Sequence, residues 1–343
     1  MENGKNLLKN ILSWILFALI TLAFLFFVVM AILGRKYALY VCLGMITHYV
    51  LSSVFHEVGH LLVGKLRKMV FVQGKILFLN FYRKGKKLKV GLCYPFETGE
   101  ISMVSRNVNE VGKDLVLLSL AGNLFTFLYL VICLALGVII KGYLGWYFFA
   151  LASVSTAYTL IINLIPLAEN GDGALLFGLL KGNEKYKSAL SLAVVDAYLY
   201  SGVSPSGIPD DALYASNGCY SQRVELVKLL KLIDSSKMER AYVYSGELLT
   251  RCDGDIKRRV LKERFFLAVI MSLSEEVEKL KEEVLPLLDE GGIEDMRISY
   301  YYRLYTKESE WANLIKGSAQ KGLESEFFKG VMLMEKKFLD FKK

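Results

Sequence analysis

The chain has 343 residues, of which 54% are hydrophobic and 22% are charged. Soluble proteins usually carry about 25% charged residues and no long apolar runs, so this composition favours a membrane protein and excludes a disordered chain. Five prolines exclude a proline-rich one. The five cysteines are widely spaced without a CxxC pair, which predicts neither a disulfide framework nor a cysteine-based zinc site.

The net charge of +8 is unevenly distributed along the chain. Residues 1–113 contain 15 Lys and Arg against 5 Asp and Glu, residues 114–180 contain one Lys against three acids, and residues 181–343 contain 26 of each. The basic residues of the first part lie beside apolar runs. They therefore predict the orientation of membrane helices, and no nucleic-acid partner is expected.

Four apolar segments, at residues 11–33, 37–64, 115–140 and 142–168, are predicted to span a membrane. Each exceeds the roughly 20 residues that cross the hydrocarbon core. The first is too long for the apolar region of a cleaved signal peptide, and in the second the only charged side chain is Glu57.

The loop at 65–113 contains eleven Lys and Arg and is predicted to be β-rich. Residues 69–81 and 88–94 have strand-like composition with Gly-Lys breaks, which predicts one or two hairpins. The excess of basic residues places this loop, the N-terminus and the C-terminus in the cytoplasm, and an even number of spans agrees with that arrangement.

From about residue 181 the sequence becomes rich in charge, and its apolar residues recur at helical spacing. Leu226, Leu229, Leu230 and Ile233 are one example. We therefore predict two domains, a membrane-embedded core at 1–180 and a cytoplasmic all-helical domain at 181–343. The pattern of the second domain favours an arrangement of stacked helical hairpins. The predicted fold class is an α-helical polytopic membrane protein with a small β-hairpin insertion and an all-α C-terminal soluble domain.

An HExxH motif occupies residues 56–60, inside the second predicted span. His56 and His60 are four residues apart on a helix, so both rings lie on one face and can bind one Zn²⁺, while Glu57 can polarise a zinc-bound water. The alternative is a hydrogen-bonded cluster of neutral His and protonated Glu. An ionised Glu in an apolar helix is costly, which favours the functional interpretation. His48, the remaining histidine, is interpreted as a packing or interface residue.

Two histidines leave a zinc site short of a third protein ligand, and that ligand should be a carboxylate. Asp114, Glu169 and Asp172 lie near the predicted membrane. His60 lies near the cytoplasmic end of its span, and the fourth span ends on the same side close to Asp172. Asn-Gly-Asp-Gly is also ordinary turn chemistry, but given the motif we favour Asp172, with Glu169 next.

These features together resemble the site-2 protease family of intramembrane zinc metalloproteases. The resemblance covers residues from about 10 to 180. It rests on HExxH in a span, a basic hairpin-rich loop, Gly-Asn at 122–123 in the next span, and Asn-x-x-Pro with Asp-Gly at 163–173. It implies that His56, His60 and Asp172 bind zinc and that Glu57 is the catalytic base. At Thr126 the family commonly has Asn.

The sequence thus predicts a zinc metalloendopeptidase of the cell membrane, with the lipid bilayer around it and a membrane protein or peptide as substrate. Asn163 is predicted to hydrogen-bond the oxyanion or the substrate, although a structural bond to the broken helix end is an equal alternative. The helical tail is predicted to bind a protein partner for recruitment or regulation. A catalytically inactive scaffold of protease ancestry is the main alternative, and a proton-relaying transporter ranks last.

Overall fold

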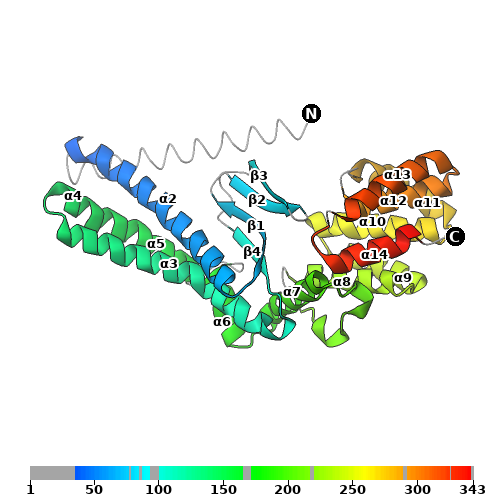
Figure 1. Cartoon of the computed structure of the whole chain (residues 1–343), viewed down its shortest axis with the longest axis horizontal. Coiled ribbons are helices and arrows are strands. Elements are labelled where there is room, and N and C mark those ends of the chain that lie inside the picture. Colours follow the sequence, from blue (N-terminus) through cyan, green and yellow to red (C-terminus); the bar gives the residue numbers. More distant parts are fainter. Residues whose placement is uncertain are drawn as a thin grey trace. The chain divides into compact units, whose positions relative to one another are not determined.

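A computed structural model describes residues 35–76, 79–84, 87–92, 100–164, 171–216, 220–288, 292–324 and 326–340 (Figure 1). The first predicted span, 11–33, lies outside these residues. The described chain is mostly helical with one small antiparallel sheet. Its elements are α2 (Arg35–Leu66), β1 (Val70–Ile76), β2 (Leu79–Lys84), β3 (Lys87–Leu92), β4 (Glu100–Val104), η1 (Val108–Glu110), α3 (Val111–Ile139), α4 (Tyr143–Trp146), η2 (Tyr147–Ala152), α5 (Ser153–Leu164), α6 (Asp172–Leu180), α7 (Glu184–Ser201), η3 (Pro205–Gly207), η4 (Asp210–Ala212), α8 (Ser221–Asp234), α9 (Met238–Arg251), α10 (Gly254–Ile270), α11 (Ser274–Val284), η5 (Leu285–Leu287), α12 (Ile293–Tyr305), α13 (Ser309–Leu323) and α14 (Lys329–Asp340).

The chain divides into two compact units. Unit 1 is Met1–His60 with Leu120–Ala174, and unit 2 is Leu61–Ser119 with Leu175–Lys343. The division cuts through α2, α3 and α6, so it does not test the predicted domain boundary near residue 180, which stays a prediction.

The structure confirms helices at the second, third and fourth predicted spans, but not that they cross a membrane. Within the described residues, one helical stretch, Val108–Ile139, is long and apolar enough to do so by its length and composition. A single helix of that kind also occurs in the cores of soluble proteins. The fourth segment is divided into α4, a π-helical turn at η2, and α5. The multi-pass topology therefore stays a prediction.

The sheet in unit 2 has the strand order β3-β2-β1-β4, with all neighbours antiparallel. Residues 69–81 contain β1 and the start of β2, and residues 88–94 overlap β3, so the predicted hairpins are confirmed. The sequence did not predict β4. This strand pairs with β1 across an irregularity between Phe71 and Gln73.

The helices from α8 onward enclose an apolar core in unit 2. All four positions that the sequence placed on one face of α8 are buried: Leu226, Leu229, Leu230 and Ile233. The core continues on α10, α11 and α12. All described elements from Asp172 onward are helices, in agreement with the predicted helical C-terminal region.

Candidate metal centre

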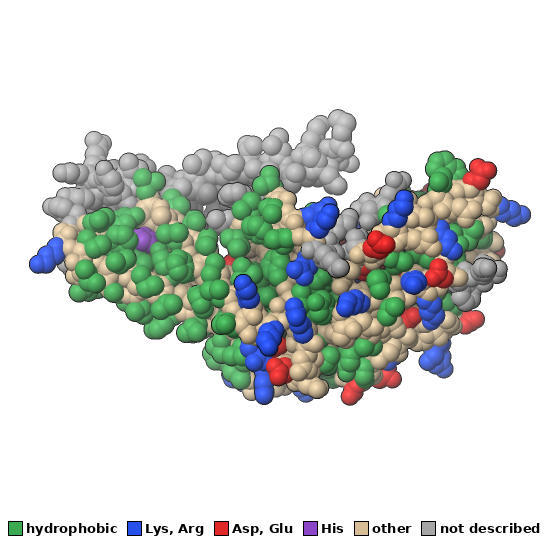
Figure 2. All heavy atoms as spheres, viewed as in Figure 1, with side chains coloured by type: hydrophobic (Ala, Val, Ile, Leu, Met, Phe, Trp, Pro, Cys, Tyr) green, Lys and Arg blue, Asp and Glu red, His purple; other side chains and the backbone are tan. Residues whose placement is uncertain are grey.

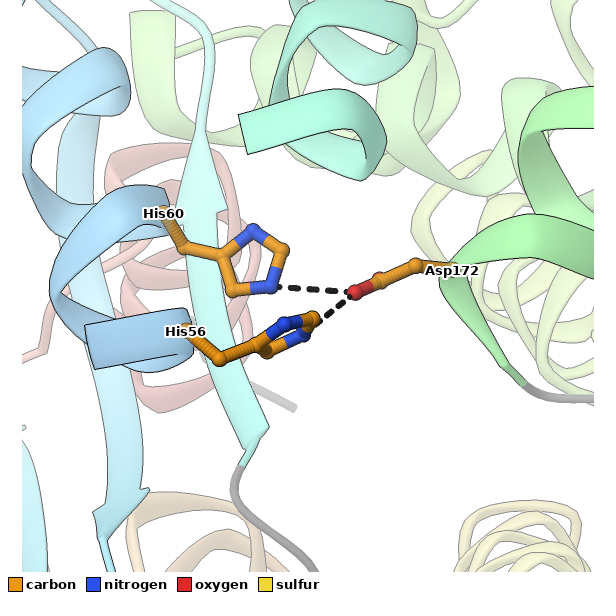
Figure 3. A group of neighbouring side chains, drawn as sticks. All are labelled: His56, His60 and Asp172. Atoms are coloured by element: carbon orange, nitrogen blue, oxygen red, sulfur yellow. Dashed lines mark hydrogen bonds and ion pairs between the residues drawn. The ribbon is translucent and has the colours of Figure 1, made fainter. Parts of the chain in front are cut away.

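The two histidines of the HExxH motif and one distant aspartate converge in unit 1 (Figure 3). His56 and His60 lie one turn apart on α2, are each only 6% exposed, and have ring centroids 4.9 Å apart. Asp172 is the first residue of α6. Its Oδ2 lies 2.9 Å from His56 Nε2 and 3.1 Å from His60 Nε2.

This geometry fits a divalent metal ion. One ligand atom from each residue lies within 4.8 Å of the other two. Zinc bonds of about 2.0–2.1 Å at tetrahedral angles would separate neighbouring ligand atoms by about 3.3 Å. The measured 2.9 and 3.1 Å are close to that edge length, so a small outward movement would make room for the ion. Two imidazoles and one carboxylate are also a known donor set of catalytic zinc.

Glycines allow the backbone of α3 to approach the histidines. A Cβ added at Gly122 would lie 2.5 Å from His56 Cε1, His56 Nε2 and His60 Nε2. A Cβ at Gly59 would lie 2.6 Å from the carbonyl oxygen of Ala121. The site is therefore shaped by the absence of side-chain atoms on both helices. Gly122, one of the residues that carry the family resemblance, thereby gains a physical role.

Another glycine places Asp172 at the start of α6. A Cβ at Gly173 would meet the carbonyl oxygens of Leu164 and Asn163, at 2.2 and 2.6 Å. The end of α5 and the start of α6 thus approach each other more closely than a larger residue would allow. Asn163 contributes its backbone carbonyl to this contact, and the predicted catalytic role of its side chain stays a prediction.

The remaining candidates lie in different surroundings. Glu57 is buried on α2 between His56 and His60 in the sequence, with 5% exposure. Glu169 lies outside the described residues. In unit 2, Asp114 accepts hydrogen bonds from Arg67 Nε at 2.7 Å and from Ser105 Oγ at 2.5 Å. Asp114 is therefore engaged in an ion pair, and of the two candidate aspartates it is Asp172 that lies beside the histidines.

His48 is buried on α2, as expected of a packing residue. Its Nδ1 lies 2.7 Å from the hydroxyl of Tyr129, and its ring packs against Tyr147 and Phe148.

One residue beside the site was not predicted from the sequence. Thr126 on α3 is fully buried, and its Oγ1 lies 3.1 Å from His56 Nδ1, the ring nitrogen that does not face Asp172. The same hydroxyl donates a hydrogen bond to the carbonyl oxygen of Gly122, at 3.0 Å. The available signal was a hydroxyl residue four positions after a glycine in an otherwise apolar helix.

The helices of unit 1 bury several polar side chains and expose many large apolar ones. Large apolar side chains are exposed along α2, α3 and α5; Leu43, Leu124, Phe127, Leu128, Val154 and Ile161 are each at least half exposed. The buried polar side chains of the same helices include Ser52, Asn123 and Thr156. Hydrophobic side chains dominate the face of these helices seen in Figure 2, whereas charged side chains are spread over unit 2.

Comparisons of the chain with protein-family models, curated proteins and solved structures found no match.

Proposed function

We propose that this chain is an integral-membrane zinc metallopeptidase that hydrolyses peptide bonds of membrane-spanning or membrane-associated substrates. The convergence of His56, His60 and Asp172, with buried Glu57 in the same helical turn, is the observation that carries the proposal. The resemblance of the motifs to the site-2 protease family points to the same chemistry.

The proposal assigns a role to each residue of the site. His56, His60 and Asp172 would hold the zinc ion. A zinc ion in such a site acts as a Lewis acid and lowers the pKa of water towards 7. Glu57 would take the proton from the attacking water and pass it to the leaving amine.

Multi-pass insertion in the membrane is part of the proposal. Soluble monomers rarely expose contiguous apolar patches larger than a few hundred Å². Membrane proteins, in contrast, present apolar side chains to lipid and turn polar groups towards neighbouring helices. By length and composition, Val108–Ile139 is the described stretch that could cross a membrane. The exposed apolar residues of α2 and α5 support further membrane spans at these two helices. That the termini are cytoplasmic and that the helical tail recruits or regulates stay predictions from the sequence.

Metal analysis and product analysis together test the proposal. The purified wild-type chain should contain about one equivalent of zinc, His60→Ala should lose it, and His48→Gln should retain it as the matched histidine control. In cells, membrane proteomes and released peptides of the wild type should differ from those of Glu57→Gln. Cleavage by Glu57→Gln would contradict the assigned role of Glu57. A chain without zinc whose products do not depend on Glu57 would favour an inactive scaffold.

A further inference from the structure

Thr126 is a buried residue whose hydroxyl reaches a predicted zinc ligand, His56. We propose that it is a positioning residue, which holds the His56 ring so that Nε2 faces the metal. This inference rests on the proposed zinc site and deepens it. It concerns the choice between the two ring nitrogens, because only the nitrogen without a proton can bind a metal.

The direction of the hydrogen bonds follows from the number of protons available. A threonine hydroxyl has one proton, and Thr126 donates it to the carbonyl oxygen of Gly122, at 3.0 Å. The carbonyl has no proton of its own to offer. Towards His56 the hydroxyl oxygen is therefore an acceptor, and Nδ1 must be the donor across the 3.1 Å contact.

A donor at Nδ1 leaves an electron pair on Nε2 of the neutral ring. Nε2 lies 2.9 Å from Asp172 Oδ2, a contact that needs a proton or a cation between these two atoms. A bound cation satisfies both of them. Two hydrogen bonds thus link the His56 ring to the backbone of α3, from Nδ1 to the Thr126 hydroxyl and from that hydroxyl to the Gly122 carbonyl. They select the tautomer that binds metal and fix the plane of the ring. Partners of this kind typically change metal affinity by 10–100-fold when they are removed.

Substitutions at Thr126 distinguish the contribution of its hydroxyl group from that of the shape of its side chain. Thr126→Val keeps the branched side chain and removes the acceptor, so zinc affinity in a chelator competition assay should fall by about 10–100-fold. Thr126→Ser keeps the hydroxyl and should restore affinity to near the wild-type value. Thr126→Ala replaces the Val variant should the latter fail to fold.

Thr159→Val is the matched control. Thr159 is also buried, donates to a backbone carbonyl four residues earlier (Ser155, 3.0 Å), and contacts α2 through the Ser52 hydroxyl at 3.2 Å. It touches none of the proposed ligands among the described contacts, so its loss should leave zinc affinity unchanged.

A spectroscopic measurement tests the tautomer without any variant. The chain has three histidines, so ¹⁵N-histidine NMR of the zinc-loaded protein is simple to assign. The His56 signals should show a protonated Nδ1 and a metal-bound Nε2. Unchanged zinc affinity in Thr126→Val, or an unprotonated Nδ1 on His56, would overturn the inference while the zinc site stands. Two other outcomes would overturn the proposed function, and this inference with it. One is a wild-type protein without zinc, and the other is a His60→Ala variant that retains zinc.

Discussion

Gly122→Ala is the substitution that tests the geometry of the proposed metal centre most directly. The added Cβ would lie 2.5 Å from three ring atoms of His56 and His60, whereas ordinary van der Waals contact begins at 3.4 Å. One or both rings must therefore move by about 0.9 Å. Metal–ligand distances tolerate about 0.2 Å, so the displaced rings can no longer bind one ion together. We expect zinc affinity to fall by about 100-fold or more, beyond the usual effect of losing an outer hydrogen-bond partner.

The same substitution should not unfold α3, because alanine is favoured over glycine inside a helix by about 1 kcal/mol. Gly112→Ala is the control in the same helix, since the Cβ added there would meet only Leu190 Cδ1, at an ordinary 3.8 Å. Zinc affinity is measured by competition with a chromophoric chelator, and helix content by circular dichroism. Wild-type affinity in Gly122→Ala would refute the reasoning, as would an equal loss in Gly112→Ala.

Two further predictions concern unit 2. Arg297 is fully buried and donates hydrogen bonds to Glu263 at 2.6 Å and Glu335 at 2.7 Å, so Arg297→Met should lower the free energy of unfolding by about 3–5 kcal/mol in denaturant titrations. Arg258→Met removes an exposed pair and should change that free energy by less than about 1 kcal/mol; equal effects would contradict the argument. Burial raises the pKa of Asp196 to about 6. The native chain then holds a proton that the unfolded chain releases near its ordinary pKa of about 3.9, so stability falls as the pH rises from about 4 to 6. Asp196→Asn should therefore raise the melting temperature at pH 7 but not at pH 4, and an equal rise at both would exclude this cause.

The elements that the sequence predicted are those whose signal is local. The helical spacing of Leu226, Leu229, Leu230 and Ile233 is enough to define the buried face of α8. The hairpins of the basic loop likewise follow from short runs of strand-forming residues. Strand β4 is five residues long, and its place beside β1 depends on an irregular pairing with residues some 30 positions earlier. Composition alone carries no such information.

The residues of the candidate site also differ in whether a local sequence signal predicts their position. His56 and His60 come together through the helical repeat, without any tertiary contact. Asp172 is 116 residues from His56, and the expectation that it shares their depth came from the predicted topology. The contact of Thr126 with His56 could not be predicted from apolar periodicity. Between residues 115 and 140 the chain has no charged residue, so the hydrophobic pattern leaves the rotation of α3 about its axis undetermined.

The structure shows which pattern does determine that rotation. Gly122, Thr126, Tyr129 and Cys133 follow one another at spacings of four, three and four, which places them on one face of α3. A Cβ at Gly122 would overlap His56 and His60, Thr126 contacts His56, and Tyr129 contacts His48, which lies two turns before His56 on α2. Under the proposed membrane insertion, the small and polar residues of α3 mark its inner face, which is the reverse of the rule for soluble helices. Applied to 115–140, that inverted rule places Thr126 on the inner face of α3, and the structure shows that this face meets the HExxH helix.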